Sequence, residues 1–219
     1  MENTMKQLKQ PVQNIVILGD SYSTFEGHIP DGFATYYSPT DERTDVRRVE
    51  DTWWYLLCKE MNVNLVQNNS WSGSTVSYTG RSGDCSKTSS FITRLEKLAA
   101  ENFFEKNKID TLLILGATND HRIDVPLGNM QWDATHEELF SVRPAICRLV
   151  QRASEYLPNG NVVFIINEEL KPDIKQAIIE ASEHYGTSFF GLCGITTNNR
   201  HPTVEGMKQI KDQVKKFLS

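Results

Sequence analysis

The sequence predicts a single α/β domain in which a five-stranded parallel sheet lies between two layers of helices. Apolar runs of strand length alternate with stretches of helical pattern, which favours right-handed crossovers and a parallel sheet. These runs are uniformly apolar, as in strands covered on both faces. A length of 219 residues fits one domain, and no repeat, low-complexity tract or linker divides it. We assign 14–219 to this three-layer α/β/α domain and 1–13 to a polar N-terminal extension.

The elements follow in order along the chain. The expected strands are 14–19, 63–67, 111–116, 161–166 and, with a weaker pattern, 187–190. The expected helices are 51–62, 90–107, 135–157, 171–185 and 203–218. The last helix has the clearest one-face pattern, preceded by Pro202, which suits a helix start. Its apolar positions are Val204, Met207, Ile210, Val214 and Phe217.

The composition is that of an ordinary globular protein, with 39% hydrophobic and 23% charged residues. The 23 basic and 28 acidic side chains give a formal charge of -5 without a basic stripe, so nucleic acid is not an expected partner. No apolar run approaches the length of a membrane span, and 1–13 lacks the apolar segment of a secretory signal. We therefore expect a cytoplasmic location for the chain as written, and the sequence gives no oligomeric state.

The four cysteines are expected to be free thiols, mostly buried, because they are far apart and form no C-x-x-C pair. They are Cys58, Cys85, Cys147 and Cys193.

Two long loops mark one rim of the predicted sheet. Residues 20–50 follow the first strand and 117–134 follow the third, and both loops exceed the usual limit of about 12–15 residues for loops without a function. Each begins at the carboxyl end of a strand, where open α/β sheets bind ligands. We interpret this rim as a binding site.

The familiar motifs for phosphate, dinucleotide or zinc binding are absent, as is G-x-S-x-G. The five histidines make no ligand set at zinc spacing with cysteine or carboxylate. A metal site in the loop around Asp120-His121 is an open alternative. They are His28, His121, His136, His184 and His201. No metal or organic cofactor is expected.

Ser21 and His201 are the candidates for nucleophile and base. Ser21 ends the Gly19-Asp20-Ser21 segment directly after the first strand, and His201 lies between the last strand and the last helix. The topology places both on one rim, and acyl transfer from a serine needs such a base. The alternatives are an ordinary Gly-Asp-Ser turn and a surface histidine.

Two further strand ends could supply donors to an oxyanion. Gly73 lies in the polar segment after the second strand, where a glycine lets the backbone N–H approach a ligand. Asn119 follows the third strand and could offer its side-chain amide. The alternatives are a flexible polar turn and an Asx-turn.

In this order, the segments resemble the SGNH (GDSL-like) hydrolase family over about residues 14–218. The segments that carry the resemblance are Gly19-Asp20-Ser21, Gly73, Gly116-x-x-Asn119-Asp120 and His201-Pro202. The resemblance implies a flavodoxin-like fold, with Ser21 as the nucleophile and His201 as the general base and acid. It assigns the oxyanion donors to the backbone N–H groups of Ser21 and Gly73 and to the Asn119 side chain. Family members hydrolyse esters and thioesters of lipids, sugars and small acyl compounds without a metal or organic cofactor.

One position departs from the family pattern. Three residues before the histidine the family usually has an aspartate, and this chain has Asn198. Three possibilities stay open. A Ser–His dyad could be helped by Asn198 or by a backbone carbonyl, a carboxylate such as Glu168 or Glu169 could reach the histidine, or the activity could be feeble. We favour the first.

The loops suggest a small polar ester as substrate, since they hold aromatic and polar side chains rather than a lipid tunnel. The candidate substrate-binding residues are Tyr22, His28, Trp53, His121 and Trp132. Aromatic faces edged by polar groups suit sugar rings, so we expect an acetyl or similar short acyl group on a carbohydrate-like or small alcohol. Burial of Trp53 in the core is the alternative for that residue. An arginine-rich rim would equally suit an anionic substrate.

Other functional classes also remain open at this point. They are a lysophospholipase or thioesterase of the same family, a weakly active or inactive binding domain that keeps the fold, and a flavodoxin-like cofactor binder. The absence of a glycine-rich phosphate loop argues against the cofactor binder.

Overall fold

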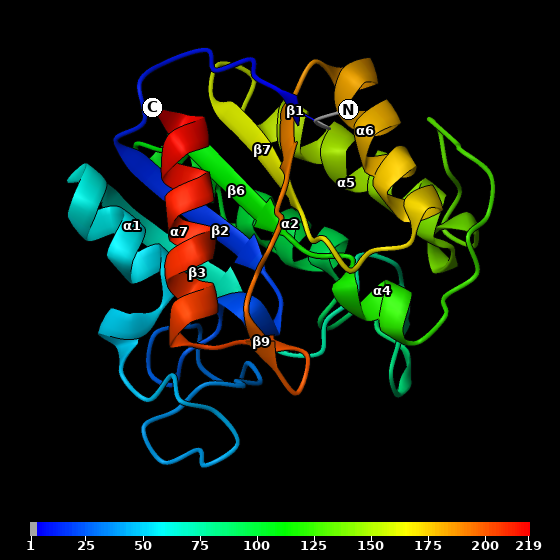
Figure 1. Ribbon diagram of the computed structural model, residues 1–219. Coiled ribbons are helices and arrows are strands. Elements are labelled where there is room, and N and C mark those ends of the chain that lie inside the picture. The colour runs from blue at the N-terminus through cyan, green and yellow to red at the C-terminus, as the bar shows by residue number, and fades with distance from the viewer. Residues whose placement is uncertain (1–3) are drawn as a thin grey trace.

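A computed structural model, which describes residues 4–219, contains one six-stranded sheet between two layers of helices (Figure 1). The strand order is β1-β8-β7-β6-β2-β3. The strands are β1 (Thr4–Met5), β2 (Asn14–Gly19), β3 (Asn64–Ser70), β6 (Thr111–Leu115), β7 (Asn161–Ile166) and β8 (Ser188–Gly191). The five strands after β1 are all parallel, which confirms the expected α/β/α sandwich. In chain order these five strands lie 2-1-3-4-5, the flavodoxin-like arrangement.

The sixth strand was not expected from the sequence. β1 pairs antiparallel with β8 and lies in the segment interpreted as an extension. The following residues are held to the same edge, because Gln7 N–H donates to Ser188 Oγ (2.9 Å) and Lys9 N–H donates to Asn161 Oδ1 (2.7 Å). Backbone pairing of this kind uses N–H and C=O groups that every residue carries, so the polar side chains gave no sign of it.

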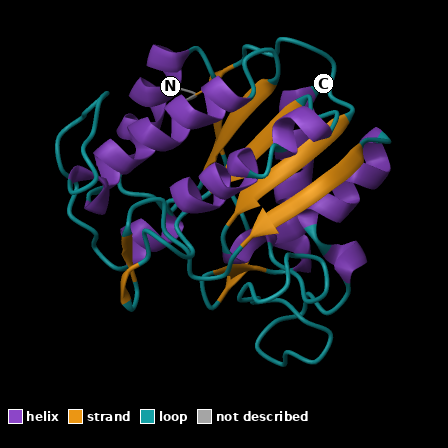
Figure 2. Cartoon of the chain, turned by 180° about the vertical axis from the view of Figure 1, so that it is seen from behind, coloured by secondary structure: helices purple, strands orange, loops and turns teal. Residues whose placement is uncertain are grey.

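Helices cover both faces of the sheet, as the views from the two sides show (Figures 1 and 2). One face carries α1 (Trp53–Met61) and α7 (Val204–Leu218). The other carries α2 (Phe91–Ala100), α5 (Val142–Tyr156) and α6 (Pro172–Tyr185). None of the helices in residues 4–219 is long and apolar enough to cross a membrane.

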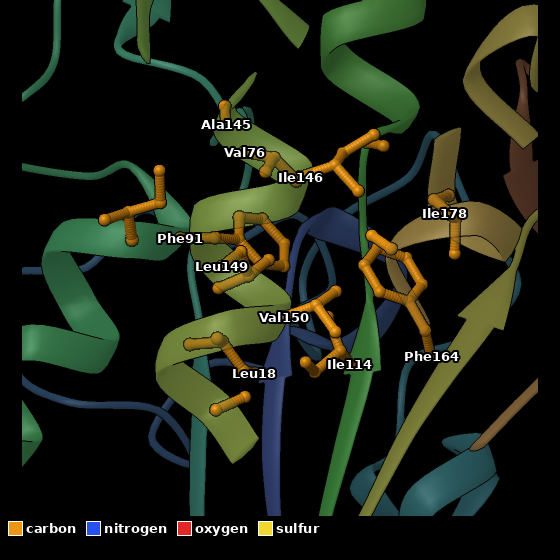
Figure 3. Packing of buried hydrophobic residues seen from close by; sticks show 14 of the residues in the cluster. Leu18, Val76, Phe91, Ile114, Ala145, Ile146, Leu149, Val150, Phe164 and Ile178 are labelled. Carbon is orange, nitrogen blue, oxygen red and sulfur yellow. The ribbon is translucent and has the colours of Figure 1, made fainter. Parts of the chain in front are cut away.

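Two apolar clusters form the core, one on each side of the sheet. Along β2, Val16 and Leu18 belong to the α2–α5–α6 side, whereas Ile15 and Ile17 belong to the α1–α7 side. Figure 3 shows the first cluster, where strand residues such as Leu18 lie against side chains from the helices. Burial on both faces explains why the strands read as uninterrupted apolar runs.

Several boundaries differ from the predictions. The helix expected at 90–107 divides into α2 and α3 (Phe103–Lys106), because Asn102 adopts a left-handed conformation (φ +55°). The helix expected at 135–157 becomes a 3₁₀ turn (Glu138–Phe140) followed by α5. Short elements also form where loops were expected. They are α4 (Thr118–Arg122), the hairpins β4–β5 (Thr79–Gly80 and Gly83–Asp84) and β9–β10 (Thr197–Asn198 and His201–Pro202), and 3₁₀ turns at Ser21–Ser23 and Val49–Asp51.

The cysteines form no disulfide. Cys85 and Cys147 are buried, Cys58 is half-buried and Cys193 is exposed.

Candidate active site

Ser21 lies in a tight turn directly after β2. Gly19 is required there because a Cβ at this position would lie 2.5 Å from Ser70 Oγ on the neighbouring strand. Asp20 then caps the 3₁₀ turn by accepting a hydrogen bond from the Tyr22 N–H (3.0 Å). The Asp20 carboxyl is fully buried, and this burial raises its pKa from 3.8 to about 6. The turn therefore has a defined backbone that places Ser21 at the carboxyl edge of the sheet.

Two tryptophan side chains of α1 donate hydrogen bonds to this turn. The Trp53 indole N–H donates to Ser23 Oγ (3.2 Å), and the Trp54 indole N–H donates to the Ser23 carbonyl (2.9 Å). Trp53 is fully buried, so the assignment of this side chain to substrate binding is wrong. Its role is to support the turn that carries Ser21.

His201 reaches Ser21 from the β9–β10 hairpin, which Figure 1 shows at the lower ends of the sheet strands. Its Nε2 lies 3.0 Å from Ser21 Oγ, and its Nδ1 lies 3.0 Å from the Asn199 carbonyl oxygen. A carbonyl only accepts hydrogen bonds, so Nδ1 carries the proton in the neutral ring and Nε2 accepts from the serine hydroxyl. This tautomer is the one a general base requires.

The group that faces His201 Nδ1 is a backbone carbonyl and none of the three side chains considered from the sequence. Asn198 is exposed and is the cross-strand backbone partner of His201. Glu168 accepts from the N–H groups of Gly194 and Ile195 (2.7 and 2.8 Å). Glu169 forms an ion pair with Arg122 (2.7 Å). The hydrogen-bond partner of the His201 ring at Nδ1 is thus a backbone carbonyl, and a catalytic Ser21–His201 dyad remains a prediction.

The hairpin turn before His201 is unusual because two residues with side chains adopt left-handed backbone angles. Asn199 has φ +49° and Arg200 has φ +62°. The Arg200 carbonyl accepts from the Tyr22 hydroxyl (2.9 Å) and from the Arg122 guanidinium. Tyr22 is buried, so it supports the turn rather than lining an open pocket.

An aromatic ring covers the histidine. Tyr36 stacks on the His201 ring with the centroids 3.5 Å apart and the planes inclined by 11°. The Arg43 guanidinium lies 5.2 Å from the Tyr36 ring centroid. Tyr36 thereby restricts the imidazole to the orientation that faces Ser21.

The surroundings of His201 disfavour its charged form. Desolvation by burial and the positive charges of Arg122, Arg43 and Arg81 lower its pKa from 6.5 to about 4, against the opposing effect of the hydrogen bond to Asn199. The imidazole is therefore neutral and able to accept a proton at neutral pH.

Three groups are expected to donate hydrogen bonds to an oxyanion: the backbone N–H groups of Ser21 and Gly73 and the Asn119 side chain. Within residues 4–219, the backbone N–H groups of Ser21 and Gly73 have no acceptor. Gly73 adopts φ +81°, a conformation that favours glycine. One amide hydrogen of Asn119 is donated to the Ser74 carbonyl (2.9 Å), and its Oδ1 accepts from Arg81 (3.0 Å). The second amide hydrogen of Asn119 has no acceptor in the described chain.

A buried arginine ties these donors to the strand end. Arg94, which is 1% exposed, donates to the Gly19 carbonyl and to Ser74 Oγ (both 3.1 Å). It also donates to Ser89 O (3.0 Å) and to Asn69. Desolvation by burial lowers the pKa of Arg94 to about 9. The sequence carried no signal for this role, since a single arginine in an amphipathic helix normally lies on its polar face.

Asp120 holds the later part of residues 71–78, the segment between β3 and β4 that we call the Gly73 loop. Its two carboxylate oxygens accept from the backbone N–H groups of Val76 (2.8 Å) and Ser77 (3.0 Å). Burial raises the pKa of this fully buried carboxyl, while the two backbone hydrogen bonds oppose the rise. Asp120 thus holds the backbone at Val76 and Ser77 in place. Its position directly after Asn119 in the sequence gave no sign of this role.

The remaining predicted binding residues make no recorded contact with Ser21 or His201. His28 is exposed beside Phe25 and Trp54, and His121 is half-buried on α4. Trp132 stacks on His184 (centroids 4.0 Å apart) near the C-terminal end of α6, which Figure 1 shows at the edge opposite β9. The assignment of Trp132 to the substrate site is therefore wrong. The 117–134 segment begins at the rim with Asn119, but Trp132 lies further along it and packs near the C-terminal end of α6.

The arrangement can perform acyl transfer. The Ser21 hydroxyl hydrogen-bonds to a neutral imidazole, and within residues 4–219 the backbone N–H groups of Ser21 and Gly73 have no acceptor. Within residues 4–219, no group of three or more His, Cys, Asp or Glu side chains is placed to hold a metal ion.

Comparison with known proteins agrees with this geometry. The model of the GDSL-like Lipase/Acylhydrolase family matches residues 13–218. A crystal structure described as a GDSL-like lipase from Bacteroides ovatus is 38% identical, with a TM-score of 0.86 over 95% of this chain and 99% of its own. A second, from Bacteroides uniformis, is also 38% identical, with a TM-score of 0.86 over 94% of this chain and 95% of its own. A search of curated proteins finds no significant match.

The same fold recurs at much lower identity in a carbohydrate acetylesterase from Sinorhizobium meliloti. It is 13% identical, with a TM-score of 0.58 over 93% of this chain and 97% of its own, which shows a common fold alone. The family and the fold together define a carboxylic ester hydrolase. The chain belongs to the GDSL-like lipase/acylhydrolase family.

Proposed function

We propose that Ser21 is the nucleophile of this ester hydrolase and that His201 is its general base. The observation that carries the proposal is the 3.0 Å contact between Ser21 Oγ and His201 Nε2, with the proton of the ring held on Nδ1. As Oγ attacks the ester carbonyl carbon, its proton passes to Nε2. The imidazolium then returns this proton to the leaving alkoxide, and the alcohol departs from an acyl-Ser21 intermediate. Water, deprotonated by the same nitrogen, hydrolyses the acyl-enzyme.

The negative charge on the former carbonyl oxygen requires donors that are already in place. The backbone N–H groups of Ser21 and Gly73 and the free amide hydrogen of Asn119 are suited to this task, because no acceptor in residues 4–219 competes for them. The contact from Arg81 to Asn119 Oδ1 orients the amide so that its nitrogen, not its oxygen, belongs to this set.

We infer a small, polar ester as the substrate, with a short acyl group such as acetyl on a carbohydrate-like or small alcohol. Two aromatic pairs lie near the proposed catalytic residues. Tyr36, with the Arg43 guanidinium over its ring, stacks on His201, and Phe33 packs against Trp71 with the centroids 4.2 Å apart. The Trp71 N–H donates to the Gly19 carbonyl at the end of β2. Such surfaces suit the apolar face and hydroxyl rim of a sugar. The alternatives are a long-chain lysophospholipid or thioester substrate and a binding domain without turnover.

The test is hydrolysis of 4-nitrophenyl esters by the intact protein, the Ser21→Ala variant and the His201→Ala variant. We expect hydrolysis of the acetyl ester to fall by about 10³-fold or more in each variant, in line with the loss of a member of a catalytic unit. Folding is checked by circular dichroism. A fluorophosphonate probe should add covalently to the intact protein and not to Ser21→Ala.

An acyl-chain series separates the alternatives. Rates that fall from acetyl to octanoyl support the short-acyl proposal, whereas rates that rise along the series support a lipid or thioester substrate. Turnover that survives in both variants would refute the assignment of the dyad.

A further inference from the structure

The charges around the catalytic pair are unevenly compensated. Three guanidinium groups act electrostatically on His201: those of Arg122, Arg43 and Arg81. Arg122 is paired with Glu169 (2.7 Å), and Arg43 is paired with Asp41 (2.6 Å). Of these three arginines, Arg81 alone has no carboxylate partner in residues 4–219.

Arg81 is exposed but anchored. It occupies the two-residue tip of the β4–β5 hairpin, and this hairpin is held to the domain by the Thr79 hydroxyl, which donates to the Phe140 carbonyl (2.8 Å). The guanidinium itself donates to Asn119 Oδ1 (3.0 Å). This contact fixes the cation in position without neutralising it.

The position of Arg81 is directly beside the proposed oxyanion donors. A Cβ built on Gly73 would lie 3.8 Å from Arg81 Cδ and 3.9 Å from its Nε. The same side chain touches Asn119. Arg81 thus lies against two of the three groups that would surround the carbonyl oxygen of a bound ester.

The guanidinium has donors to spare. An arginine carries five N–H donors in a fixed planar fork, and only one contact, to Asn119, is recorded for Arg81 in the described chain. A planar fork of this kind matches a carboxylate or another oxyanion by two parallel hydrogen bonds. A neutral sugar hydroxyl would leave the positive charge without a partner.

We propose that Arg81 is an anion-binding, specificity-determining residue, and that the substrate is an ester with a carboxylate or similar oxyanion a few atoms from its carbonyl. The proposal rests on the ester hydrolysis assigned above and narrows its substrate class. An acidic sugar ester or a small hydroxy-acid ester could contact both the aromatic rings near His201 and the Arg81 guanidinium.

The decisive comparison uses two esters of nearly the same shape, 3-acetoxybenzoate with an anionic carboxylate and 3-acetoxybenzamide with a neutral amide in its place. We expect kcat/KM to favour the benzoate by about 10-fold to 100-fold, the range that corresponds to a charge-assisted hydrogen bond. Arg81→Gln should reduce this preference to about 1, and Arg81→Lys should retain part of it. A second pair, mono-4-nitrophenyl succinate and 4-nitrophenyl succinamate, shows whether an anion on the acyl side is preferred instead.

Lys87→Gln is the matched control, since it removes one positive charge from the same exposed stretch, and its side chain makes no recorded contact with the site. It should preserve the preference for the benzoate. Equal rates for charged and neutral esters on both pairs in the intact protein would overturn the proposal. So would a loss in Arg81→Gln that is the same for both esters, which would limit Arg81 to positioning Asn119.

A binding measurement separates this proposal from the proposed function. Calorimetry on Ser21→Ala, which cannot form an acyl-enzyme, should show tighter binding of the benzoate by a similar factor. The double variant with Arg81→Gln should lose that difference. Preference in binding without any turnover would support the anion site and refute the hydrolase assignment, whereas Ser21-dependent turnover without preference would do the reverse.

Discussion

The imidazole Nδ1 of His201 lies 3.0 Å from the carbonyl oxygen of Asn199, two residues earlier in the same hairpin. The aspartate of a serine-protease triad fixes the tautomer of the histidine and stabilises the imidazolium by its charge. The carbonyl contact provides the first of these two effects. Replacing that aspartate by asparagine lowers kcat by about 10⁴ through the wrong tautomer. A carbonyl cannot donate and so keeps the proton on Nδ1. What it lacks is a negative charge to stabilise the imidazolium.

Asn198→Ala tests whether the carbonyl is sufficient. The Asn198 side chain is exposed and has no recorded contact with the imidazole, so we expect kcat/KM to stay within about threefold of the intact protein, less than 1 kcal/mol of transition-state stabilisation. The measurement is steady-state hydrolysis of 4-nitrophenyl acetate. A decrease of about 100-fold or more would show that the amide at this position holds the ring.

The pH dependence of kcat/KM follows from the lowered pKa of His201. Activity needs the neutral ring, and burial together with three arginines lowers this pKa to about 4. The acidic limb of the profile should therefore fall well below the ordinary histidine value of about 6.5. Asp20, whose pKa is raised to about 6, is the other group that could titrate in this range. If His201 sets the limb, Asp20→Asn leaves its position unchanged, and a limb near 6 that disappears in this variant would assign it to Asp20.

The same two groups affect stability with opposite signs. Between pH 4 and 6.5 the unfolded chain binds more protons at His201 than the folded chain, so this residue makes the unfolding free energy rise with pH. Asp20 binds more protons in the folded chain between about 3.8 and 6, so it makes the unfolding free energy fall with pH. Asp20→Asn removes the falling contribution. We expect urea titrations of this variant to show a steeper rise in stability between pH 4 and 6 than those of the intact protein.

The backbone strain before His201 gives another prediction. Arg200 adopts φ +62°, and a left-handed conformation costs about 1–2 kcal/mol for a residue with a side chain. Two-residue hairpin turns of this kind favour Asn-Gly, so Arg200→Gly should raise the unfolding free energy by up to about 1 kcal/mol after the entropy cost of glycine. Asn199→Gly is the control, since asparagine already tolerates this region and should gain less. Urea midpoints provide the comparison, and a lower midpoint for Arg200→Gly would contradict the strain argument.

The sequence predicted what depends on periodicity and chain order. The runs at 14–19 and 161–166 coincide with β2 and β7, because strands buried on both faces leave an uninterrupted apolar pattern. Ser21 and His201 were expected on one rim, since carboxyl ends of parallel strands meet at the same edge, and the structure brings them into contact.

Other features depended on geometry that the sequence does not encode in a readable pattern. The carbonyl beside His201 results from left-handed angles at Asn199 and Arg200, and neither is a glycine that would signal them. Trp132 lies in the long segment after β6, which suggested a place at the rim. In the structure its ring stacks instead on His184 of α6. Arg94 is buried through contacts to backbone carbonyls, which every residue carries.

Arg94 leads to the last prediction. Its guanidinium donates to the Gly19 carbonyl at the end of β2 and to Ser74 Oγ in the loop of Gly73, so it joins the two segments that carry the proposed nucleophile and an oxyanion donor. Arg94→Leu also removes the only recorded donors to the Ser89 carbonyl and to Asn69 Oδ1, and a buried acceptor without a partner costs about 1–3 kcal/mol. We expect the unfolding free energy to fall by about 3 kcal/mol or more in urea titrations.

Lys97→Leu on the same helix is the control, because its side chain is exposed and its loss should change stability by less than about 0.5 kcal/mol. Arg94→Lys retains a positive charge but not the planar fork, and a single ammonium cannot reach carbonyls on both segments. It should therefore recover only part of the stability that Arg94→Leu loses. A fully active and stable Arg94→Leu variant would mean that the contacts of Asp120 with Val76 and Ser77 hold the Gly73 loop without help from Arg94.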